Sequence, residues 1–147
     1  MNRLSEPEHF STILEFAAGI ADRGIPLSLV LVEPDPAGSV PPADAVERLL
    51  SEFSQRVRRS DRCTHLGETR FAALLVDCNR QGAMIFADRL QSAAGDGVGV
   101  TISCGIASWT QDMSSHRDLV DAAQGALRRV QEAGGDGIEL HHAAPLG

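Results

Sequence analysis

The segment RRSDRCTHLGETRF, residues 58–71, has the pattern of a helix end, a strand, a tight turn and the start of a second strand. CTHLG (63–67) and RFAALLVD (70–77) are short, mainly apolar runs that meet near Gly67. Two such runs joined at a glycine predict a β-hairpin. Arg70 stands at the turn, in a place where a catalytic carboxylate would be expected of an enzyme.

Around this hairpin, helix and strand patterns alternate. Apolar periodicity predicts helices at 7–22, 44–58, 80–94 and 114–134, and apolar runs predict further strands at 26–34, 97–109 and 137–142. The order predicts a single α+β domain, with a central mixed, mostly antiparallel sheet, a βαββαβ core of ferredoxin-like or nucleotide-cyclase-like type and flanking helices. We expect the domain to span residues 1–142 and residues 143–147 to form a disordered tail.

The amino-acid composition argues against several classes of function. The net charge is −7, which argues against binding to nucleic acid. All 13 basic residues are arginine, as is typical of a GC-rich bacterial genome. The three cysteines have neither metal spacing nor a disulfide pattern, and no segment predicts a membrane span or a signal peptide. We therefore expect a cytoplasmic protein that contacts no membrane.

Four segments, in order, carry a family resemblance. They are PLSLVLVEPD (26–35), GETRF (67–71), VGVTISCGIAS (98–108) and LVDAAQGALRRVQEAGGDGI (119–138). Together they resemble the GGDEF domain of diguanylate cyclases, over nearly the whole chain. The third segment is the most specific, because it is close to the family's V-T-I-S-x-G-I-A strand. GETRF occupies the place of the signature G-G-D-E-F.

The resemblance also implies a degenerate active site. The positions that correspond to the family's catalytic and phosphate-binding residues are Glu33, Asp35, Gly67, Glu68, Thr69, Arg70 and Gln131. Cyclases of the family use carboxylates to hold divalent metal ions over a triphosphate. Arg70 replaces one of those carboxylates, and a guanidinium there repels a metal. We expect no metal, no cofactor and no cyclase activity, and we predict that Arg70 forms an ion pair with Glu33.

One binding element of the family is retained. Arg58 and Asp61 match R-x-x-D, the allosteric motif that binds the product cyclic di-GMP, and Arg89 falls where a second arginine reaches the same ligand. Arg59 is an additional candidate contact. An arginine fork suits guanine N7 and O6 or a phosphate, and an aspartate suits guanine N1 and N2. The motif is short, however, and an arginine at a helix end followed by a turn-forming aspartate has a structural explanation too.

Three functions remain open from the sequence. The first is a catalytically inactive signalling domain that binds cyclic di-GMP. The second is a protein-binding or dimerisation module, either a homodimer or a regulator of a partner protein, with no nucleotide ligand. The third is a residual enzyme or a nucleotide-binding regulator that holds GTP in the altered site. The first two differ in whether Arg58 and Asp61 are free to receive a ligand.

Overall fold

The computed structural model describes residues 4–5, 7–35, 43–58, 61–66 and 69–141. Its elements are β1 (Leu4–Ser5), α1 (Pro7–Ala21), β2 (Leu27–Pro34), α2 (Ala43–Arg56), β3 (Arg62–Leu66), β4 (Arg70–Val76), α3 (Arg80–Ala93), a π-helical turn η1 (Ala94–Val98), β5 (Ile102–Ser108), α4 (His116–Glu132) and β6 (Gly137–Leu140). The predicted tail at 143–147 lies outside the described residues, so its disorder stays a prediction.

The strands form one six-stranded sheet in the order β1-β3-β4-β2-β5-β6. β1 with β3 and β5 with β6 are parallel, and the three pairings between them are antiparallel. The predicted hairpin is present, since Leu66 pairs with Arg70 across its turn. The prediction of a mixed, mostly antiparallel sheet in an α+β domain is confirmed.

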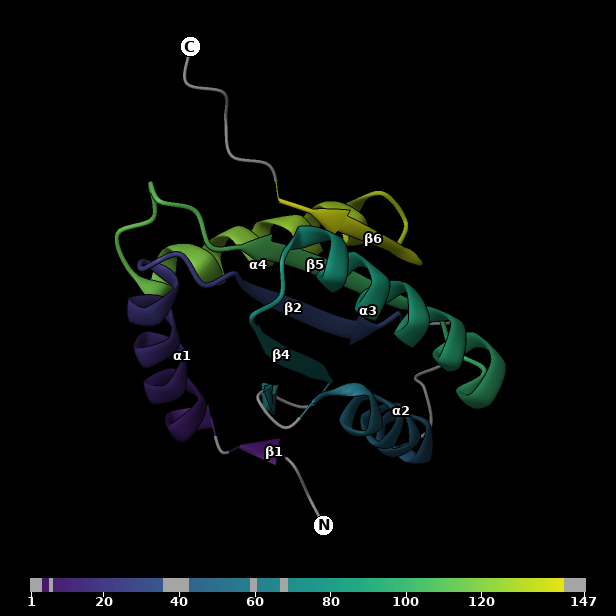
Figure 1. Ribbon diagram of the computed structural model, residues 1–147. Coiled ribbons are helices and arrows are strands. Elements are labelled where there is room, and N and C mark those ends of the chain that lie inside the picture. Colours follow the sequence, from purple (N-terminus) through teal and green to yellow (C-terminus); the bar gives the residue numbers. More distant parts are fainter. Residues whose placement is uncertain (1–3, 6, 36–42, 59–60, 67–68, 142–147) are drawn as a thin grey trace.

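Helices cover both faces of this sheet, and Figure 1 shows the four of them arranged around it. The residues of β2 contribute to a hydrophobic layer on each face of the sheet, because successive side chains of a strand point to opposite faces. Val30 and Val32 pack under α2 and α3, whereas Leu29 and Leu31 pack under α1 and α4. Phe53 of α2 also contacts Phe71 of the hairpin, with ring centroids 5.8 Å apart. The hairpin is thus fixed from one side by α2.

β5 and α4 approach each other closely at Gly105. A Cβ atom added there would lie 2.3 Å from the backbone nitrogen of Leu127 and 2.4 Å from the carbonyl oxygen of Ala123. Only glycine fits this contact. α4 itself begins at a capping box, in which Ser115 and Asp118 each bond the other's backbone. These two features fix α4, and with it Gln131, over the end of the sheet.

The structure corrects two predicted strand boundaries and adds one short strand. The strand predicted at 97–109 begins only at Ile102, because Ala94–Val98 continue α3 as a π-helical turn that ends at Gly99 in the left-handed conformation. The closing strand ends at Leu140 rather than at residue 142. β1 was not predicted, because two residues carry no periodic pattern.

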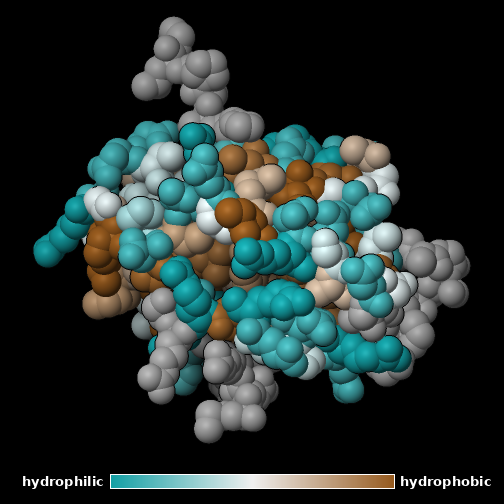
Figure 2. Space-filling view, turned by 45° about the vertical axis from the view of Figure 1, so that its right-hand side comes forward, coloured by the Kyte–Doolittle hydropathy of each residue, from teal (hydrophilic) through white to brown (hydrophobic). Residues whose placement is uncertain are grey.

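Hydrophilic residues cover much of the surface, and hydrophobic residues emerge in patches between them (Figure 2). Among the described residues, the large hydrophobic side chains that are clearly exposed are Phe16, Ile25 and Ile85. No helix in the described part of the chain combines the length and the apolar character that crossing a bilayer requires.

Candidate functional site

Glu33, near the end of β2, is the centre of the altered active site. Its Oε2 accepts hydrogen bonds from Arg70 Nη2 at 3.0 Å and from Gln131 Nε2 at 2.8 Å. Its Oε1 accepts one from Thr69 Oγ1 at 3.0 Å. The predicted ion pair between Arg70 and Glu33 is confirmed. Three of the substituted positions, on β4, α4 and the hairpin turn, therefore meet on a single carboxylate.

This network keeps Glu33 ionised. Partial burial by itself would raise the pKa of Glu33, but hydrogen bonds from Gln131, Arg70 and Thr69 and the charge of Arg70 together hold it below its usual value. A cation that approached this carboxylate would meet the Arg70 guanidinium, which already occupies Oε2. Glu33 therefore joins β2 to β4 and α4 through these internal bonds.

Asp35, two residues along, is also engaged. Its Oδ2 accepts from Thr101 Oγ1 and from the Asp136 backbone N–H, both at 2.8 Å, and its Oδ1 accepts from Ser103 Oγ at 2.5 Å. Gly135 lies so close that an added Cβ would be 2.6 Å from Oδ1. Asp35 therefore joins the end of β2 to β5 and to the turn before β6. The sequence prediction missed Thr101 and Ser103, although their alternation on the β5 side placed both hydroxyls on one face.

Within the described ranges, no cluster of three or more histidine, cysteine, aspartate or glutamate side chains could hold a metal. Gly67 and Glu68 lie outside the described residues. Cys104 is fully buried, and burial raises the pKa of its thiol, which keeps it protonated and unreactive. His65 packs on the ring of Phe71 at a centroid distance of 4.9 Å.

The R-x-x-D motif lies at the other end of the hairpin. Arg58, Asp61 and Arg89 line one groove of about 510 Å³, together with Arg56 and Cys78. Arg58 and Arg89 were identified from separate parts of the sequence, so their meeting here is a result of the fold. Cys78 was not predicted, and burial raises the pKa of its thiol. Arg59 lies outside the described residues.

Asp61 is already bonded within the protein. Its side chain is only 3% exposed. Oδ2 accepts from the Arg58 backbone N–H at 2.9 Å, and Oδ1 accepts from the Val76 backbone N–H at 3.0 Å. The carboxylate thus connects the segment after α2 to the end of β4. Because its oxygens are bonded internally, they favour a structural role for Asp61 over a role in ligand binding.

The two arginines are more accessible than Asp61. The side chain of Arg58 is 60% exposed, donates from Nη2 to the Val76 carbonyl at 3.0 Å and lies 3.5 Å from the Asp61 carboxylate. Arg89 is exposed and makes no hydrogen bond or ion pair within the part of the chain that the structure describes. The groove therefore presents guanidinium groups, with Asp61 behind them.

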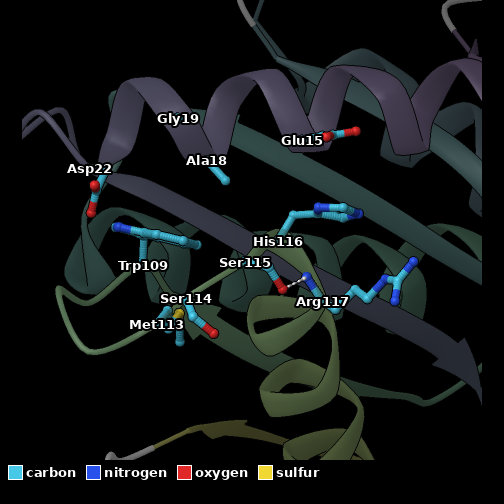
Figure 3. A pocket seen from close by; sticks show the side chains of 10 residues that line it. All are labelled: Glu15, Ala18, Gly19, Asp22, Trp109, Met113, Ser114, Ser115, His116 and Arg117. Atoms are coloured by element: carbon cyan, nitrogen blue, oxygen red, sulfur yellow. Dashed lines mark hydrogen bonds between the residues drawn. The ribbon is translucent and has the colours of Figure 1, made fainter.

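A second hollow, of about 460 Å³, lies between α1 and the start of α4 (Figure 3). Glu15 and Asp22 line it from α1, and Trp109 and His116 line it from the other side. The Trp109 indole nitrogen is buried without a hydrogen-bond partner among the described atoms. No sequence motif pointed to this hollow, because its walls come from segments nearly 90 residues apart.

Comparison with solved structures supports the fold. The chain resembles the GGDEF domain of DgcB from Caulobacter crescentus in complex with c-di-GMP (TM-score 0.86, 14% identity, covering 95% of this chain and 90% of that one). It also resembles the active GGEEF domain of a Vibrio cholerae diguanylate cyclase (0.85, 15%, 96% and 99%). A third likeness is the FimX GGDEF domain of Pseudomonas aeruginosa (0.80, 17%, 93% and 94%). No curated protein matches the sequence.

The family model decides the classification. The model described as "Diguanylate cyclase, GGDEF domain" matches residues 44–137, which is more than half of the chain. This range includes the hairpin, β5 and α4, which carry three of the four segments that resemble the family in the sequence, whereas the first segment, at 26–35, precedes it. The chain belongs to the GGDEF domain family.

Proposed function

We propose that this GGDEF domain is catalytically inactive and binds cyclic di-GMP through the groove between α2 and α3. The single observation that carries the proposal is the convergence of Arg58 and Arg89 on one groove, with Arg56 beside them. Cyclic di-GMP is a dianion with two guanines, and guanidinium forks bind both phosphates and guanine edges. The similar DgcB domain was solved in complex with c-di-GMP.

The proposed loss of catalytic activity is supported by the contacts at the turn end of the hairpin. Glu33 is paired with Arg70 and bonded to Gln131, so the carboxylate that would hold a metal is neutralised from two elements. Asp35 is bonded to β5 and to the β6 turn. GTP with magnesium would have to break both networks. These contacts also disfavour the third alternative, a domain that retains GTP.

Asp61 enters the proposal as a positioning residue. Both of its carboxylate oxygens accept backbone N–H groups, so it holds Arg58 at the groove rather than offering a free carboxylate to guanine. The thiols of Cys63, Cys78 and Cys104 fit a reducing compartment, in keeping with a proposed role in cytoplasmic signalling.

Calorimetric titration of cyclic di-GMP tests the proposal. We expect the wild type to bind with micromolar or tighter affinity and GTP with magnesium to give no heat. Arg89→Ala should weaken binding at least tenfold with little effect on stability, because the Arg89 side chain is exposed and forms no hydrogen bond or ion pair in the described structure. Arg58→Ala should weaken binding to a similar extent. Arg128→Ala, which removes an exposed arginine of α4 far from the groove, is the matched control and should bind like the wild type.

The second candidate is a protein-binding module without a nucleotide ligand. The burial and internal bonding of Asp61 favour it, because a motif retained for structure needs no ligand. Absence of heat with cyclic di-GMP in the wild type would reject the first proposal in favour of this one. Heat that persists in both Arg58→Ala and Arg89→Ala would place the ligand elsewhere.

A further inference from the structure

The outer side of α1 carries an apolar surface that the domain itself leaves uncovered. Ile13, Phe16 and Ile20 share one side of the helix and, with Ile25 and Val76, line a groove of about 270 Å³. Phe16 is 72% exposed and Ile25 is 41% exposed. Isolated exposed hydrophobic residues are common, but a cluster around a groove marks an interaction site.

The opposite flank of α1 is acidic. Glu15 and Asp22 are seven residues apart and therefore lie on the same side of the helix, two turns from each other. Both are exposed, and neither side chain forms an ion pair or hydrogen bond with another described residue. They line the hollow of Figure 3, where Trp109 faces the end at which Asp22 lies and Arg117 extends away from that end. This end suits a cation, which the Asp22 carboxylate attracts.

Gly19 lies between the apolar and the acidic flanks of α1. It lies within α1, and an added Cβ would meet no atom within 4 Å. Glycine in a helix interior costs about 1 kcal/mol relative to alanine, and nothing within the domain requires it here. Because Gly19 has no side chain, a second helix can approach the backbone of α1 closely at this position and cross it there. Crossing there would bring the partner over the apolar groove and the acidic hollow together.

We propose that α1 is the docking surface for an amphipathic α-helix of a partner protein, which places an apolar side chain in the Phe16 groove and a lysine or arginine beside Asp22 and Trp109. Since an α-helix is about 10–12 Å across, the two anchors would be about seven residues apart on the partner. The charge selects a basic partner over a second copy, because the chain carries −7 and a self-contact would bring the same acids together. The Phe16 groove adjoins the Arg58 groove, since Pro26 lines both, but the proposal does not rest on nucleotide binding.

Trp109 provides the readout. It is the only tryptophan, and the chain has no tyrosine, so intrinsic fluorescence reports on this hollow alone. The probe is a synthetic 18-residue helical peptide without aromatic residues, with leucines on one face and flanking lysines; its twin carries glutamates in place of the lysines. We expect saturable binding and a change in Trp109 fluorescence with the basic peptide, and at least tenfold weaker binding with the acidic one.

Variants connect the binding to α1. Phe16→Ser should weaken the basic peptide at least tenfold, and so should the double change Glu15→Gln with Asp22→Asn. Ile85→Ser alters a residue of similar type that is 52% exposed on α3, and should leave binding unchanged. Equal binding of the two peptides, no binding of either, or binding that survives Phe16→Ser would overturn the proposal. A dimer in sedimentation equilibrium that Phe16→Ser abolishes would overturn it in favour of a second copy.

Discussion

At the scale of single residues, the pair Arg70 and Glu33 makes stability depend on pH. The pKa of Glu33 is lowered in the folded state, so its contribution is present above the unfolded pKa, about 4.3, and is lost as the pH falls through the folded pKa. The side chains are 33% and 22% exposed, so the pair is worth about 0.5–1 kcal/mol.

We therefore expect Arg70→Met to lower the free energy of unfolding by about 0.5–1 kcal/mol at pH 7 and by less at pH 3, because the contribution of the Glu33 charge is lost as the pH falls through its lowered folded pKa. Urea denaturation at the two pH values measures this difference. Arg128→Met, which removes an exposed arginine, controls for the loss of positive charge. A deficit of equal size at pH 7 and pH 3 would show that Arg70 stabilises the hairpin by packing rather than by charge.

Asp61 gives a second prediction at this scale. Asp61→Ala leaves the backbone N–H groups of Arg58 and Val76 without their acceptor, in a place where the side chain is 3% exposed. Because unsatisfied buried donors are costly, we expect a loss of about 2–4 kcal/mol in the free energy of unfolding. Urea denaturation tests this, with the exposed Asp88→Ala expected to stay within about 0.5 kcal/mol of the wild type. A loss below 1 kcal/mol in Asp61→Ala would instead return Asp61 to the list of free ligand contacts.

At the scale of elements, replacing glycine with alanine should have opposite effects on stability at two positions. Gly105→Ala forces β5 and α4 apart, because the new Cβ would lie 2.3 Å from the Leu127 nitrogen. Overpacking of this kind costs about 1–3 kcal/mol, and backbone contacts on a rigid helix favour the upper end. Gly19→Ala meets no atom and should stabilise α1 by about 0.5–1 kcal/mol. Thermal unfolding of the two variants measures both effects, and an equal shift in the two would contradict this account of how β5 and α4 pack.

At the scale of the whole molecule, sequence patterns predicted the order of elements because each carries its own period. Boundaries were less accessible: the run GVGVTI has the composition of a strand, yet the turn at Ala94–Val98 takes its first residues. In the site, the alignment of GETRF with the G-G-D-E-F signature was enough to predict that Arg70 pairs with Glu33. The pattern could not show that Gln131, 98 residues away, bonds the same carboxylate, or that Asp61 is buried. Such contacts depend on tertiary packing that no local pattern encodes.

Ligand binding should also appear in the stability of the whole domain. A ligand that binds only the folded state at 100 times its dissociation constant stabilises by about 2.7 kcal/mol. For a chain of 147 residues this raises the melting temperature by about 5–10 °C. We expect cyclic di-GMP to produce this shift in the wild type and in Arg128→Ala but not in Arg89→Ala, while GTP with magnesium produces none. Differential scanning calorimetry measures all four cases. A shift with GTP and magnesium would mean that the bonds of Glu33 and Asp35 open to admit a nucleotide, and the domain would then have to be regarded as one that still binds the substrate of its family.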